Sequence, residues 1–100
     1  RFHADYDLLL LPTLPIVAFE AGQERPPGQD GWTDWTPFSY PFNLSQQPAA
    51  TVPCGLTSEG LPAGLQIVGP PHRDDLVLKA AHAYEMLVGG FPAPPMAKAR

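Results

Sequence analysis

The sequence has a single cysteine, few charges and no long apolar run. Cys54 stands alone among 100 residues, so no disulfide can close within the chain and an oxidising compartment gains no support. No apolar run approaches the ~20 residues that a transmembrane helix needs. No stretch has the charged, apolar and small-residue succession of a signal peptide. We therefore expect a soluble, cytoplasmic protein without a membrane partner.

Charge is scarce and follows no pattern. Only 16% of the residues are charged, the formal net charge is -4, and the six Lys and Arg residues are scattered, which argues against a nucleic-acid partner. Fourteen prolines and nine glycines indicate many loops, but 44% hydrophobic and 10% aromatic residues are too apolar for a disordered chain. A chain of 100 residues that begins at Arg1 fits one small domain at most, or a fragment or processed product.

The usual patterns of catalytic groups are missing as well. Acyl transfer needs a nucleophile, a base within hydrogen-bond reach and oxyanion donors. None of the serines lies in a G-x-S-x-G or other Gly-rich segment; they are Ser39, Ser45 and Ser58. The three histidines, His3, His72 and His82, are too far apart to suggest a metal site. No phosphate-binding glycine motif occurs, so we predict no catalytic residue, no cofactor and no metal.

A leucine-rich strand opens the chain. Within Tyr6–Pro12, the run Leu8–Leu11 is short, apolar and closed by proline, which is typical of a strand covered on both faces in a sheet interior. A helix start is the alternative. The segment 18–34 follows as a long loop rich in glycine and proline. Trp35–Gln47 is an aromatic tract that we expect to form a short helix over Phe42–Gln46, because proline is tolerated in a first helical turn.

A β-hairpin and a helix follow. Ala49–Leu56 and Pro62–Val68 are predicted strands joined by a Gly-containing turn. Because Pro53 has no N–H, the first strand is expected to be an edge strand or to end there, and Cys54 is expected to be a buried structural thiol. In the second strand Leu65 and Ile67 share one face. The predicted helix spans Asp74–Val88, with two aspartates at its start, an Asp75–Lys79 pair, and Gly89-Gly90 at its end. Its apolar face is Val77, Ala80, Ala81, Tyr84, Leu87 and Val88.

These elements do not cover one another. The leucine strand needs cover on two faces, but the chain offers one substantial helix and one short helix. A bare apolar sheet face would be hidden by more chain or by another molecule. The sequence therefore predicts part of a larger body, and an isolated chain that self-associates.

Three collinear motifs resemble those of amidase-signature enzymes. They are YDLLLLPT at 6–13, PFNLSQQPAATVPCG at 41–55 and GLPAGLQIVG at 60–69, with the start of the helix at Asp74 as a further match. The resemblance implies an α/β fold in which residues 1–100 are the C-terminal portion of an amidase-signature domain. A mixed sheet with flanking helices would be ordered over about 5–88, with a tail at 89–100.

The resemblance also implies where the chemistry lies. The family's two catalytic serines and lysine occupy upstream segments that no position here matches, so hydrolysis of a small amide through an acyl-enzyme would belong to a longer parent. The tract before the Asn-Leu segment borders the substrate entrance in the family. The corresponding pocket candidates are Trp35, Thr36, Phe38 and Tyr40, with core packing as the alternative for each. Asn43 and Gln66 match motif positions, and we expect them to hydrogen-bond buried backbone.

Two departures leave alternatives open. Gln46 replaces a motif glycine, which puts the local turn in doubt. The family's amidotransferase A-subunits would carry an acidic residue near Thr36, and only Asp34 is close. The leading hypothesis is the C-terminal part of an amidase. The alternatives are a non-catalytic interaction module and the A-subunit of a tRNA-dependent amidotransferase.

Overall fold

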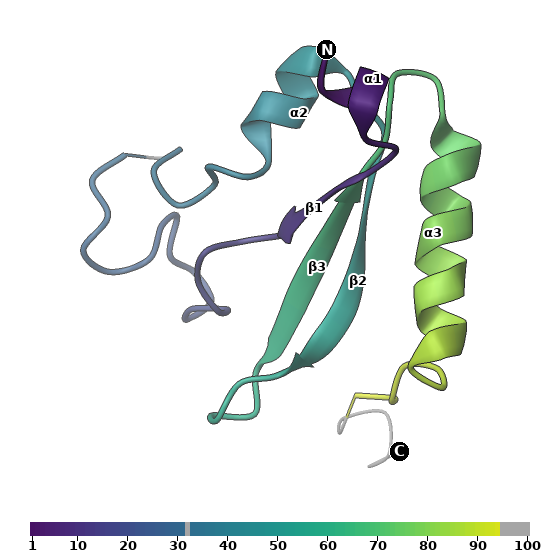
Figure 1. Ribbon diagram of the computed structural model, residues 1–100. Helices are drawn as coiled ribbons and strands as arrows, with labels where there is room; N and C mark the ends of the chain where they lie inside the picture. Colours follow the sequence, from purple (N-terminus) through teal and green to yellow (C-terminus); the bar gives the residue numbers. More distant parts are fainter. Residues whose placement is uncertain (32, 95–100) are drawn as a thin grey trace.

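The computed structural model describes residues 1–31 and 33–94. Its elements are α1 (Phe2–Asp5), β1 (Leu9–Pro12), α2 (Tyr40–Ser45), β2 (Ala49–Leu56), β3 (Pro62–Val68) and α3 (Asp74–Leu87). Figure 1 shows α3 lying along the β2–β3 hairpin and the stretch between β1 and α2 leaving on the opposite side. The predicted α/β class and element order are confirmed, with α1 as an unpredicted addition. Of the predicted tail, residues 95–100 lie outside the described residues.

The three strands form one antiparallel sheet in the order β1-β3-β2. β1 pairs with β3 from Leu9 opposite Val68 to Pro12 opposite Leu65, and β2 pairs with the other side of β3. The prediction that the leucine strand lies in the sheet interior is wrong for the described residues, because β3 is the central strand and β1 an edge. Leu10 is accordingly 57% exposed. The predicted edge position of the strand that contains Pro53 is confirmed.

The core lies between the hairpin and α3. Val52, Ile67 and Val77 are buried there, and partly buried side chains pack around them: Leu8, Ala50, Leu65, Ala80, Ala81, Tyr84 and Phe91. Leu65 and Ile67 thus share the face that we predicted. The prediction of the helix's apolar face is wrong at its C-terminal end, since Leu87 is 84% exposed. Gly89 and Gly90 adopt positive φ and reverse the chain, so the ring of Phe91 packs beside Tyr84 instead.

The opposite face of the sheet is covered near its middle by the chain that leads into α2. Gln66 is 7% exposed, and its Nε2 donates to the carbonyl of Phe38 at 2.7 Å. The expected buried hydrogen bond to backbone is therefore confirmed for Gln66. For Asn43 it is wrong, because that residue is exposed on α2. The Gln66–Phe38 bond attaches the aromatic tract to the central strand.

The helices begin and end slightly differently from the sequence prediction. α2 starts at Tyr40, two residues before the predicted start, with proline in its first turn. It ends at Ser45, and its C-cap is Gln46, whose φ of 58° and ψ of 33° are left-handed. The left-handed turn that the motif glycine would form is thus formed by a residue with a side chain. α3 spans Asp74–Leu87, with Val88 as its C-cap. Asp75 pairs with Arg73, at 2.9 Å between Nε and Oδ1, rather than with Lys79 as predicted.

Candidate functional site

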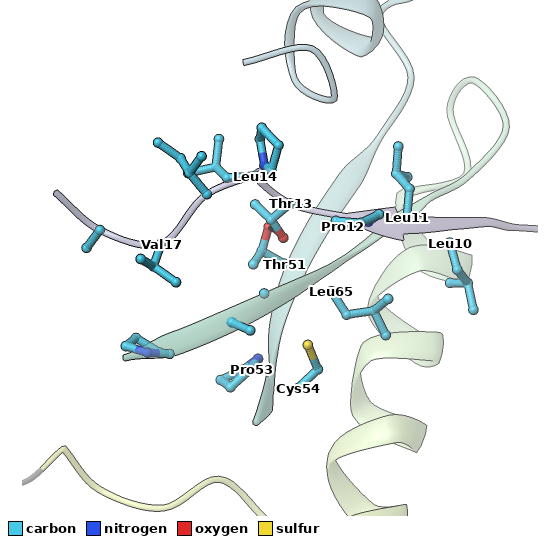
Figure 2. A pocket seen from close by; sticks show the side chains of 16 residues that line it. Leu10, Leu11, Pro12, Thr13, Leu14, Val17, Thr51, Pro53, Cys54 and Leu65 are labelled. Atoms are coloured by element: carbon cyan, nitrogen blue, oxygen red, sulfur yellow. Dashed lines mark hydrogen bonds between the residues drawn. The ribbon is translucent and has the colours of Figure 1, made fainter. Parts of the chain in front are cut away.

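An apolar groove opens where the chain leaves the sheet after β1. One wall is the segment 13–18 and the other is the far half of the hairpin, including Thr51, Pro53 and residues 62–65. Figure 2 shows Leu14 and Val17 on one side and Pro53 and Cys54 on the other. The volume is about 970 Å³. None of its lining residues is charged, so the groove suits an apolar occupant.

Two threonines form the polar centre of this groove. Thr13 Oγ1 donates to Thr51 Oγ1 at 3.3 Å, and the backbone N–H of Thr13 donates to the carbonyl of Gly64 at 3.0 Å. A Cβ on Gly64 would lie 2.7 Å from Thr13 Oγ1 and 3.1 Å from Thr51 Cγ2. Gly64 therefore lets the two side chains meet over the central strand. Because the two hydroxyls are partly satisfied by their bond to each other, a ligand in the groove has little need to hydrogen-bond to them.

The four predicted pocket residues lie elsewhere. Trp35, Thr36 and Phe38 are half-buried and Tyr40 is exposed at the start of α2. Thr36 Oγ1 donates to the carbonyl of Thr33, and the Phe38 carbonyl accepts from Gln66. None of the four lines the groove. Their role in a substrate pocket remains a prediction.

Trp35 has one feature that packing alone does not explain. Its ring meets Phe19 edge-on, with centroids 5.2 Å apart. Its Nε1 is buried and has no hydrogen-bond partner within residues 1–31 and 33–94. A buried indole N–H without an acceptor is costly. The indole N–H of Trp35 is therefore a buried donor without an acceptor among the described residues.

The candidate nucleophiles have no base beside them. Ser45 Oγ donates to Oε1 of Gln47 at 2.8 Å and lies 3.4 Å from the carbonyl oxygen of Phe42, and an amide oxygen is no general base. In the part of the chain that the structure describes, no serine hydroxyl bonds to a histidine or lysine. Cys54, predicted to be buried, is exposed and lines the groove, since β2 is irregular beyond Pro53.

Gln47 joins α1 to the sheet, a connection that no sequence pattern indicates. Its Nε2 lies 2.9 Å from His3 Nε2 and donates to the carbonyl of Gly69 at 3.1 Å. His3 Nδ1 lies 3.0 Å from the carbonyl of Tyr6. A proton on Nδ1 donates to that carbonyl and leaves Nε2 as the acceptor for Gln47. His3 therefore has a structural explanation.

Over the described ranges, 1–31 and 33–94, no three His, Cys, Asp or Glu side chains gather as metal ligands would. Among the helices of those ranges, none has the length and apolar character needed to cross a membrane.

Comparison with known proteins gives consistent matches. The model of the family described as Amidase matches residues 1–78. The glutamyl-tRNA(Gln) amidotransferase A-subunit from Brevibacillus brevis is 41% identical over 92 residues, which are 92% of this chain and 19% of that protein. An acylamidase from Rhodococcus erythropolis is 42% identical over an alignment of 90 residues that covers 84% of this chain and 19% of the acylamidase.

Solved structures agree with these matches. The glutamyl-tRNA(Gln) amidotransferase A-subunit from Thermotoga maritima superposes with a TM-score of 0.79 and 34% identity, over 93% of this chain and 21% of the other. A 6-aminohexanoate cyclic dimer hydrolase gives 0.70 and 35%, over 86% and 20%. This chain therefore spans about a fifth of the length of these relatives.

Proposed function

Because this chain belongs to the amidase family, we propose that it forms the C-terminal part of an amidohydrolase that cleaves small carboxamides through an acyl-serine intermediate. In that reaction a serine oxygen attacks the amide carbonyl, the amine leaves, and water hydrolyses the resulting ester. The serine and its base are contributed by chain outside residues 1–100. Residues 1–100 supply part of the scaffold and part of the substrate pocket.

This proposal is carried by one observation: a chain of the amidase family shows no nucleophile bonded to a base among its described residues. No described serine hydroxyl bonds to a basic side chain, while the groove is uncharged and the buried Trp35 indole has no acceptor among the described residues. The chain also spans only about a fifth of its relatives. Such a chain fits the role of a supporting segment better than that of a complete enzyme.

An amidotransferase A-subunit is the second candidate. It is favoured by relatives of that name at 41% and 40% identity. It is disfavoured by Thr36, since the acidic side chain expected near that position is absent and Asp34 instead accepts from the backbone N–H of Gly31 at 2.7 Å. The acylamidase is as similar, at 42%, so identity alone does not separate the two functions.

Segment exchange tests the proposal. The part of the Rhodococcus erythropolis acylamidase that aligns with this chain is replaced by residues 1–100, and the purified chimera is assayed on simple aryl and alkyl amides. We expect measurable amide hydrolysis by the chimera and none by this chain alone. A matched chimera built on the Brevibacillus brevis amidotransferase protein is assayed for amidotransfer.

The two chimeras separate the candidates. Hydrolysis by the acylamidase chimera without amidotransfer by the other supports the amidase. Amidotransfer with no amide hydrolysis favours the amidotransferase role. Turnover by residues 1–100 alone that is lost on Ser45→Ala would overturn the proposal that catalytic residues lie outside this chain. If both chimeras fold but are inactive, the result supports the hypothesis of a non-catalytic interaction module instead.

A further inference from the structure

One side-chain hydrogen bond attaches α1 to the end of the sheet. None of the four residues of α1 is buried, and the helix lies at the same end of the sheet as α2 (Figure 1). Among the described residues, the bond between His3 and Gln47 is the only hydrogen bond that joins α1 to any residue beyond β1. A cavity of about 300 Å³ remains beside it, lined in part by Phe2 and Pro71. The attachment of α1 therefore depends on this bond.

The partners of Gln47 fix the orientation of its amide. Its Nε2 donates at 3.1 Å to the carbonyl oxygen of Gly69, a group that can only accept, and its Oε1 accepts from the hydroxyl of Ser45 at 2.8 Å. Turning the amide over would set Oε1 against the Gly69 carbonyl, so that two acceptors would face each other. Gln47 therefore presents an N–H, and not an oxygen, to Nε2 of His3 at 2.9 Å.

The ring of His3 fits this contact only when it is neutral. Its Nδ1 lies 3.0 Å from the carbonyl oxygen of Tyr6, so a proton on Nδ1 is used there and Nε2 accepts from Gln47. A protonated imidazole has a donor at both nitrogens and no acceptor. Its second N–H would meet the N–H of Gln47, and the attachment would become a repulsion between two donors.

No charged group near His3 replaces the bond that protonation would remove. Arg1 lines the same cavity and Asp5 lies on the same helix, but neither forms an ion pair with His3 among the described residues. Tyr6 faces the ring with its carbonyl, and its phenol ring stacks on Phe2. The other segments at this contact, residues 45–47 and 69–71, carry no charged side chain. A charge on His3 therefore has no carboxylate paired with it among the described residues.

We propose that α1 is a proton-sensitive latch, which is docked on the end of the sheet while His3 is neutral and is released when the ring takes up a proton. The docked state binds one proton fewer than the released state, so acid favours release. Histidine is the side chain that ordinarily changes charge between about pH 5 and about pH 8. Release uncovers Leu9 and Pro71, which line the cavity beside the latch. The inference does not depend on the proposed function.

Nuclear magnetic resonance of labelled residues 1–100 at dilute concentration tests the latch without an activity assay. Long-range proton–nitrogen spectra of the His3 ring identify its tautomer, and nitrogen relaxation gives the backbone order parameters of residues 3–6. At about pH 7.5 we expect the Nδ1–H tautomer and order parameters close to those of β3. At about pH 5.5 we expect both ring nitrogens to be protonated. The order parameters of residues 3–6 should then fall from about 0.85 to below about 0.6, while those of β3 stay unchanged.

Three variants separate the latch from a general effect of acid. Gln47→Glu supplies a carboxylate that accepts from a protonated ring, so residues 3–6 should be more ordered at the lower pH than at the higher one. His3→Phe removes the acceptor, and residues 3–6 should be mobile at both pH values. His82→Gln is the matched control, since it removes an exposed histidine of α3 that lies 4.0 Å from Glu85, and it should keep the response of the unmodified chain.

Several results would overturn the latch. An Nε2–H tautomer at about pH 7.5 removes the acceptor on which the docked state depends. Residues 3–6 that stay ordered with a protonated His3 show that the contact tolerates the charge. Loss of order in β3 together with α1 shows that acid unfolds the whole chain. If Gln47→Glu does not fold, the comparison of His3→Phe with the unmodified chain still decides, because only the unmodified chain should change between the two pH values.

Discussion

At the residue scale, Gly64 lies so close to two threonine side chains of the groove that it leaves no room for a side chain of its own. Its φ is not positive, so glycine is needed there for space and not for backbone conformation. A Cβ would lie 2.7 Å from the Thr13 hydroxyl oxygen, which is a contact that real side chains do not make. The side chains of Thr13, directly after β1, and of Thr51 in β2 occupy the space beside this glycine.

Gly64→Ala should lower the free energy of unfolding by about 1–3 kcal/mol, the usual cost of overpacking. Urea denaturation followed by tryptophan fluorescence measures the change. The double variant Gly64→Ala with Thr13→Ala removes the closest oxygen and should recover part of the loss. Equal stability of Gly64→Ala and the wild type would contradict the close approach.

Trp35 belongs to the same scale because its effect depends on one N–H group. In the acylamidase chimera we expect Trp35→Phe to raise KM roughly 2- to 10-fold, the equivalent of one neutral hydrogen bond, with kcat little changed. Thr33→Ala, at an exposed position two residues before Trp35, is the control. A KM that stays constant in Trp35→Phe removes the indole from the substrate pocket.

At the element scale, the ends of the helices are determined by single residues. Gln46 ends α2 in the left-handed region, which costs a residue with a Cβ about 1–2 kcal/mol. Arg73 precedes α3 and reaches both carboxylate oxygens of Asp75, at 2.9 and 3.3 Å. Both features lie outside the hydrophobic pattern that identifies the helices.

Gln46→Gly should raise the free energy of unfolding by about 0.5–1 kcal/mol. It removes the left-handed strain but adds the backbone entropy of glycine in the unfolded chain. Ser45→Gly, one residue earlier and inside the helix, should destabilise instead. Chemical denaturation of the two variants gives the comparison, and a loss of stability in Gln46→Gly would show that the left-handed turn carries no strain.

The hydrogen bond from Arg73 lowers the pKa of Asp75, and the attraction between their charges adds to this. A depressed folded-state pKa stabilises the fold above the unfolded pKa and loses that contribution as the pH falls through the folded value. We expect a small loss of stability below about pH 4, and a smaller one in Asp75→Asn. Urea midpoints from about pH 7 to about pH 3 at low salt measure it, since salt screens an exposed pair.

Asp74→Asn is the control for this pH dependence. It removes a charge from the same helical turn and leaves the Arg73–Asp75 pair in place. An acid response that is the same in Asp75→Asn and in the wild type would exclude the ion pair as its source.

At the scale of the whole molecule, exposed apolar surface dominates. Only four hydrophobic residues among those described are buried, namely Val52, Ile67, Val68 and Val77. Large apolar side chains are exposed on several elements, including Leu10, Leu44, Leu56 and Met86. A surface of this kind favours association with other apolar surfaces.

We expect the isolated chain to form polydisperse oligomers as its concentration rises and to bind a hydrophobic dye such as ANS. Sedimentation velocity and dye fluorescence test this. Leu10→Lys should reduce both signals more than His82→Lys, which changes an exposed polar position on α3. A compact monomer at all concentrations that binds no dye would contradict the expectation.

Much of the fold was predictable because it depends on local patterns. The alternation in Pro62–Val68, the turn before it and the spacing in Asp74–Leu87 indicate a hairpin and a helix close to their observed bounds. The contacts of the candidate site were less predictable from the sequence. The contacts between Thr13 and Thr51 and between His3 and Gln47 join residues 38 and 44 positions apart, and no local pattern specifies such pairs.

The sequence by itself determined the hairpin, the long helix and the family resemblance, since each depends on residue types at short spacing. Only the tertiary structure decided that β1 lies at an edge, that Cys54 faces a groove and that Phe91 replaces Leu87 at the core. The physical reason is that periodicity records which faces of an element are apolar. Which neighbour covers each face is decided by how the whole chain, and whatever packs against it, comes together.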